Sequence, residues 1–248
     1  MDDIALLLCG NQTEGTAKIA LDQLTSSVQK FSARAVTFLI EDFTDEAQSF
    51  GPFCARVLLE NSCAALVGRL DSFRMLYLSE FQAQPEYDYG KRAKSAFSWT
   101  GDVIPDEKLS ATLWSTDHDL PKISRALFSK HFDHIFWKPA INRMIDYVSS
   151  LDADPILSDV LKIDPDRFID EVKGRSLQLY STLSKGVHWE FFTSALLFDE
   201  ATVKNSIRET LILIANLGLI SHFVHTAYAS LPPKEAIDSY KSIRSLVQ

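Results

Sequence analysis

Apolar residues recur at intervals of three and four positions along most of the chain, which is the pattern of amphipathic helices. Between residues 16 and 31 they fall at Ile19, Ala20, Leu24 and Val28, and the same spacing continues from residue 35 to 50. Gly51-Pro52 then predicts a helix end and a new start. The spacing predicts a long spine helix from Phe53 to Phe81, whose apolar positions are Leu58, Leu59, Ala65, Leu66, Leu70, Phe73, Leu76 and Tyr77.

The second half of the chain carries repeated helix-start signals, because an Asp that can cap precedes a Pro that suits the first turn. These signals and the apolar spacing predict helices over 122–149 with a kink at Pro139, 155–162, 166–185, 200–229 and after Pro233. Gly186 is expected to end the helix before it. Residues 4–9 could form a short strand.

Composition agrees with a helical protein. Nine Gly and nine Pro are few for 248 residues and lie mostly where helical patterns end. Residues 84–119 are the exception, since Gly, Pro, Ser, Thr and Asp interrupt the periodicity there. We therefore predict an all-α, multi-helix bundle formed by one helical domain, 1–248, with an irregular inserted segment at 84–119 that lies over the bundle or contacts a partner.

The net charge of −8 argues against a general nucleic-acid scaffold, because affinity for phosphates depends on many Lys and Arg side chains. Local basic stretches at 91–94 and 122–143 still allow RNA binding. The three cysteines form no CxxC pair, and neither a signal-peptide pattern nor an apolar run of about 20 residues is found. We expect a cytoplasmic protein that does not enter a membrane.

Two polar residues in apolar surroundings are the first candidates for chemistry. His188 follows Gly186 and is flanked by Val187, Trp189, Phe191 and Phe192, and imidazole titrates near neutral pH. Arg69 lies among apolar residues of the spine helix, where an arginine requires a partner; a carboxylate is the expected one. We hypothesise that Arg69 and His188 share a pocket.

An arginine-bearing helix followed by Tyr180-x-x-Leu183-Ser184-x-x-x-His188 resembles the HEPN-like helical proteins of bacterial toxin and phage-defence systems. The resemblance covers residues 53–82 and 166–229. It implies a helical bundle that dimerises and cuts RNA without a metal, through an Arg-x(4–6)-His motif. In that case His188 would transfer the proton of the 2′-hydroxyl and an arginine would stabilise the phosphorane.

The spacing of that motif is not met at His188, since the nearest upstream arginine is Arg175. Only Arg125 and His131 have the required separation, and they form a rival catalytic pair. We therefore favour a non-catalytic partner or adaptor subunit of a defence or toxin-type assembly, binding another protein or a second copy of itself. The alternative is a metal-independent HEPN-type ribonuclease that uses His188 and an Arg.

A metal-binding helical bundle is a second alternative, because His131 and His134, like His222 and His225, have the i,i+3 spacing that puts two ligands on one helix face. Their aromatic neighbours favour packing at the edge of a core, and the ligand count needs both pairs to meet. We therefore expect no metal and no cofactor.

Overall fold

A computed structural model describes residues 3–11, 14–15, 17–88, 90, 96–106, 113–114, 123–188 and 198–247, although not the side chain of His188. Within these ranges all regular elements are helical and no strand occurs, so the all-α prediction is confirmed. Among the described helices, no segment combines the length and the apolar character that crossing a bilayer requires.

The α-helices of the described ranges are numbered in chain order, and the longest connection between them runs from α4 to α5. They are α1 (Asp3–Cys9), α2 (Ala17–Ile40), α3 (Asp45–Leu70), α4 (Ser72–Gln82), α5 (Lys130–Phe132), α6 (Lys138–Ser149), α7 (Phe168–His188), α8 (Glu200–Ser221) and α9 (Pro233–Leu246). Two 3-10 turns, Pro155–Leu157 and Val160–Lys162, join α6 to α7.

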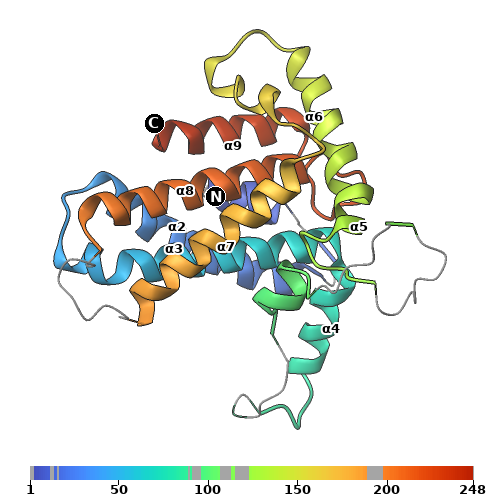
Figure 1. Cartoon of the computed structure of the whole chain (residues 1–248). Coiled ribbons are helices and arrows are strands. Elements are labelled where there is room, and N and C mark those ends of the chain that lie inside the picture. Colours follow the sequence, from blue (N-terminus) through green and yellow to red (C-terminus); the bar gives the residue numbers. More distant parts are fainter. Residues whose placement is uncertain are drawn as a thin grey trace.

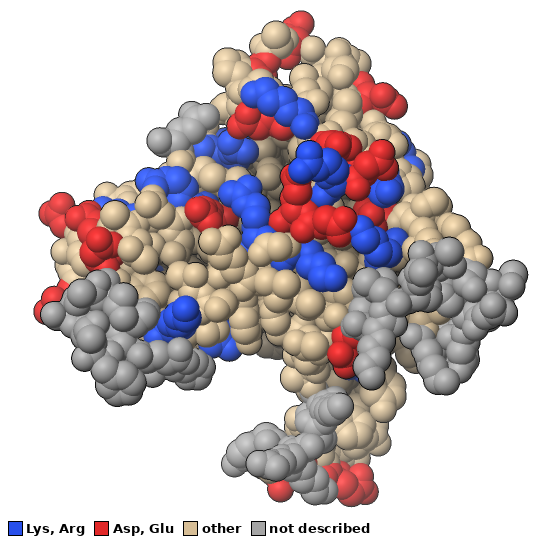
Figure 2. Space-filling model, in the orientation of Figure 1, with Lys and Arg blue, Asp and Glu red and all other residues tan. Residues whose placement is uncertain are grey.

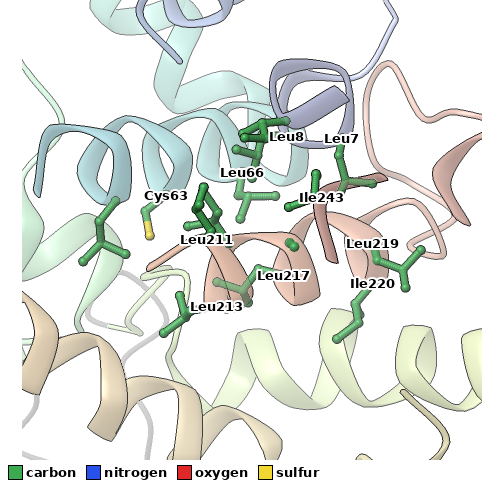
Figure 3. Packing of buried hydrophobic residues seen from close by; sticks show 14 of the residues in the cluster. Leu7, Leu8, Cys63, Leu66, Leu211, Leu213, Leu217, Leu219, Ile220 and Ile243 are labelled. Carbon is green, nitrogen blue, oxygen red and sulfur yellow. The ribbon is translucent and has the colours of Figure 1, made fainter. Parts of the chain in front are cut away.

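Helix α3 is the centre of the bundle. It packs against α2, α7 and α8, while α1 lies across α2, α8 and α9 (Figure 1). Leu66 of α3, Leu211 and Leu217 of α8, and Leu7 of α1 are fully enclosed and meet in the core (Figure 3). The three cysteines are buried free thiols.

The predicted spine helix is wrong at both ends. Helix α3 begins at Asp45, where Thr44 accepts a hydrogen bond from the backbone N–H of Ala47, and it runs through Pro52. Gly51 permits α8 to approach α3 closely here, because a Cβ at this position would lie 2.6 Å from Val203 Cγ1. The helix stops at Asp71, whose backbone angles of φ −137° and ψ 73° are not helical. Helix α4 therefore leaves the bundle in a new direction (Figure 1).

Gly186 does not end α7, which continues to His188. A Cβ built on Gly186 would lie 2.7 Å from Pro52 Cβ, so glycine is needed for the contact between α7 and α3. The prediction failed because a glycine that permits close helix packing looks, in the sequence, like a glycine that ends a helix.

Part of the predicted irregular segment belongs to the core. Val103 and Ile104 are buried, and the N–H groups of Leu127 and Phe128 donate to the carbonyls of Asp102 and Val103 at 2.9 and 3.1 Å. Residues 103–105 are thus part of the bundle, whereas most of the other described residues between 84 and 119 are exposed; 89, 91–95, 107–112 and 115–119 lie outside the described ranges.

Three further boundaries differ from the predictions. Residues 3–9 are a helix instead of a strand, and α8 ends at Ser221 instead of residue 229. The helix expected from Lys122 starts at Lys130, and it contains a π-helical turn, Asp133–Trp137, instead of a kink. Pro139 follows directly, and its missing N–H fits a local change of the hydrogen-bond pattern.

Gly10 and Gly174 provide a matched test of this packing. Gly10 has φ +73°, and a Cβ there would lie 1.9 Å from Ala229 O, whereas nothing lies within 4 Å of a Cβ at Gly174. We predict that Gly10→Ala lowers the free energy of unfolding by about 2–4 kcal/mol. Gly174→Ala should raise it by about 1 kcal/mol, since alanine stabilises helix interiors. Urea unfolding measures both; effects of the same sign would contradict the structure.

Candidate functional sites

Arg69 is buried, with 1% of its surface exposed, close to the end of α3. Each of its five N–H groups has an acceptor. They donate to the carbonyls of Tyr228 (2.9 Å) and Leu8 (3.4 Å), the hydroxyls of Ser221 (2.6 Å) and Ser230 (3.2 Å), and Nδ1 of His222 (3.0 Å). None of these partners is a carboxylate, so the prediction that Arg69 pairs with a carboxylate is wrong.

His222 is the ring that completes this cluster. Its Nδ1 accepts from both Arg69 and the backbone N–H of Leu231 (3.0 Å), so the proton of the neutral ring resides on Nε2, which donates to Leu7 O at 2.8 Å. Burial and then the nearby Arg69 charge hold the pKa of His222 well below its usual value. Burial also lowers the pKa of Arg69 to about 10, so the arginine stays charged at neutral pH.

The structure does not bring Arg69 to the position of His188. Gly186, two residues before His188, packs on Pro52 near the start of α3. Pro52 and Arg69 are 17 residues apart on one helix, which is about 25 Å at 1.5 Å per residue. The side chain of His188 lies outside the described part of the chain. The expected shared pocket is therefore replaced by an Arg69–His222 contact that sequence reasoning missed.

The rival pair, Arg125 and His131, does come together. Both side chains line a cavity of about 240 Å³ next to Asp71. Arg125 Nη2 donates to Asp71 Oδ1 at 2.5 Å, and His131 Nε2 lies 2.7 Å from Leu113 O. The other lining residues are Leu70, Ile123, Ser124, Phe132, Ile135 and Phe136.

This cavity differs from an RNA-binding groove in its charge. Asp71 neutralises Arg125, and among the described lining residues no further Lys or Arg is present. On the face drawn in Figure 2, Lys and Arg are interspersed with Asp and Glu and form no continuous basic track. Recognition of a phosphate backbone requires several uncompensated cations.

The histidines of the two predicted metal-binding pairs contact aromatic rings and backbone groups. His131 and His134 lie edge-on against Trp114, with ring centroids 5.4 and 5.1 Å apart. Both ring nitrogens of His222 are already engaged in hydrogen bonds. In the described ranges, no three His, Cys, Asp or Glu side chains lie close enough to hold a metal ion.

Helix α4 exposes aromatic side chains, two of which, Phe73 and Tyr77, were predicted as apolar positions of the spine helix. Phe73, Tyr77 and Phe81 are 66%, 52% and 38% exposed and form one row with Tyr87. The ring centroids of Phe73 and Tyr77 are 6.4 Å apart, those of Tyr77 and Phe81 6.2 Å, and those of Phe81 and Tyr87 5.9 Å. We call these four residues the aromatic ladder. Its i, i+4, i+8 spacing is visible in the sequence, but its exposure follows from the break at Asp71.

Comparison with known proteins does not assign the chain to a family. No protein-family model matches the chain, and no curated protein or solved structure matches it significantly. The HEPN-like resemblance therefore stays a prediction from the sequence.

Substitution of Arg69 tests whether this residue stabilises the fold. Lysine has three donors and cannot reproduce the five-donor fork, so Arg69→Lys leaves buried acceptors unpaired. We predict that the free energy of unfolding falls by about 3 kcal/mol or more. The matched variant Arg34→Lys changes an exposed arginine paired with Glu46 and should cost less than about 1 kcal/mol. Equal, small effects in a urea titration would show that Arg69 does not hold the fold.

Proposed function

We propose that this chain is a non-catalytic partner subunit that docks another protein through the aromatic ladder of α4. The exposure of Phe73, Tyr77 and Phe81 on one face of a projecting helix is the observation that carries the proposal. Large rings are costly to leave in water, and contiguous apolar patches on a surface mark sites of interaction.

The helix is held firmly enough to present this face. Met75 and Leu78 on its other side are buried, and Arg74 donates to both carboxylate oxygens of Asp102 at 3.0 and 3.3 Å. Arg125, fixed by Asp71, lies 6.0 Å from the centre of the Phe73 ring. A pre-organised helix loses little entropy on binding, and aromatic side chains are the usual anchors of interfaces.

The ladder suits a partner with an apolar groove, because a helix that docks in a groove inserts side chains spaced by one turn. The described part of the projection is mostly neither basic nor acidic in Figure 2, which fits burial against another protein. The HEPN-like resemblance would place the complex in a toxin or defence assembly.

Site-specific photo-crosslinking tests the docking face. A photoreactive phenylalanine analogue at Tyr77 is expected to give one discrete adduct in the native cells, and mass spectrometry of that adduct distinguishes another protein from a second copy of the chain. The same analogue at Ile40, which is 64% exposed on α2, serves as the control and should give none. The absence of an adduct at Tyr77, or equal labelling at both positions, would contradict the proposal.

A metal-independent ribonuclease is the second candidate, favoured by the shared cavity of Arg125 and His131. Under our proposal the purified protein leaves single-stranded and structured RNA intact in the presence of EDTA. RNA cleavage that is lost in both Arg125→Ala and His131→Ala, but kept in Arg34→Ala, would establish the ribonuclease instead.

A further inference from the structure

A large cavity lies behind α4, on the side opposite the aromatic ladder. It measures about 790 Å³, is open to solvent on one side, and is lined by α2, α3, α4, α7 and the segment 96–103. Its volume is within the range of pockets that bind small molecules, about 300–1,000 Å³. Leu24, Ala64, Met75 and Leu78 supply apolar walls.

An aromatic platform forms one side of this cavity. Trp99 stacks on Tyr180 with ring centroids 4.5 Å apart and an interplanar angle of 10°. Tyr180 is fixed in turn by Arg56, whose Nη2 donates to the phenol oxygen at 2.8 Å and whose guanidinium carbon lies 4.6 Å from the ring centre. With Phe97 beside it, this rigid stack offers aromatic surface to a flat ring.

The carboxylate and the amide on one wall of the cavity favour a ligand that donates hydrogen bonds, although the buried Trp99 Nε1–H has no acceptor among the described residues. Glu60 is the sole charged residue among those described as lining it, and only its Oε1 pairs with Arg56 Nε, at 3.2 Å. Asn61, next to it in sequence, donates from Nδ2 to Ser27 Oγ at 2.7 Å, which leaves its carbonyl oxygen to accept. Arg56, which partly offsets the charge of Glu60, is not among these lining residues, and neither is any Lys, His or other Arg, so a carboxylate is the one charged group that a ligand meets on the described wall.

We propose that this cavity binds an organic amine that carries a flat aromatic ring. The ring lies against the Trp99–Phe97 surface, and the amine donates to Glu60 and to the carbonyl oxygen of Asn61. This inference does not depend on the docking function of α4, because its residues face the other side of that helix.

Three probes that share a naphthalene ring and carry a cationic, a neutral or an anionic polar group test the ligand class by isothermal titration calorimetry at pH 7. We expect 1-naphthylmethylamine to bind with one-to-one stoichiometry, about threefold more tightly than 1-naphthylmethanol, as for a partly exposed ion pair. 1-Naphthoate should bind at least about tenfold more weakly than the alcohol, because like charges repel. Equal affinities for all three, or no binding at millimolar concentration, would overturn the proposal.

Variants at two positions locate the binding. Ser79 lines the cavity from α4, so the bulky ring of Ser79→Trp should narrow the cavity and weaken binding strongly, whereas Ser79→Ala should keep it. Glu60→Gln should remove the advantage of the amine over the alcohol and leave the alcohol unaffected. Circular dichroism and thermal melting check that each variant is folded. Unchanged amine binding in folded Ser79→Trp would place the ligand elsewhere and refute the site.

Discussion

The buried guanidinium of Arg69 is the constraint on which the rest of the structure depends. It joins the end of α3 to α1 through Leu8, to α8 through Ser221 and to the following turn through Tyr228 and Ser230. A buried cation is tolerated only if its donors are satisfied, and here neutral oxygens and one imidazole nitrogen satisfy all five. The segments that supply these acceptors must therefore meet at one point, which fixes how α1 and α8 cross α3.

The end of α3 next to Arg69 also determines the direction of α4. Two residues after Arg69 the backbone leaves the helical conformation at Asp71, and the Asp71 carboxylate receives Arg125. Helix α4 consequently projects from the bundle with two different faces (Figure 1). One face carries the exposed aromatic ladder, and the other closes the large cavity. Both proposals, a docking surface and a ligand cavity, thus originate in one change of direction of the chain.

The sequence predicts the helical class because apolar periodicity is a local property. It does not predict where α3 ends, because Asp71 breaks a continuous apolar pattern without Gly or Pro. It misplaces Gly51 and Gly186, since the reason for both glycines is the close approach of another helix. The partner of Arg69 could not be found either, because His222 is 153 residues away in the sequence and its aromatic neighbours indicated only that it packs at the edge of a core.

Nitrogen-15 NMR of the arginine and histidine side chains tests the central role of Arg69 most directly. We predict that the Arg69 N–H protons exchange slowly with water and that His222 stays neutral, with its proton on Nε2, at pH values at which an ordinary histidine is already protonated. The pKa of His222 is lowered because burial penalises the charged form of the ring. A His222 ring that titrates near pH 6.5, or Arg69 protons that exchange as fast as those of Arg34, would contradict it.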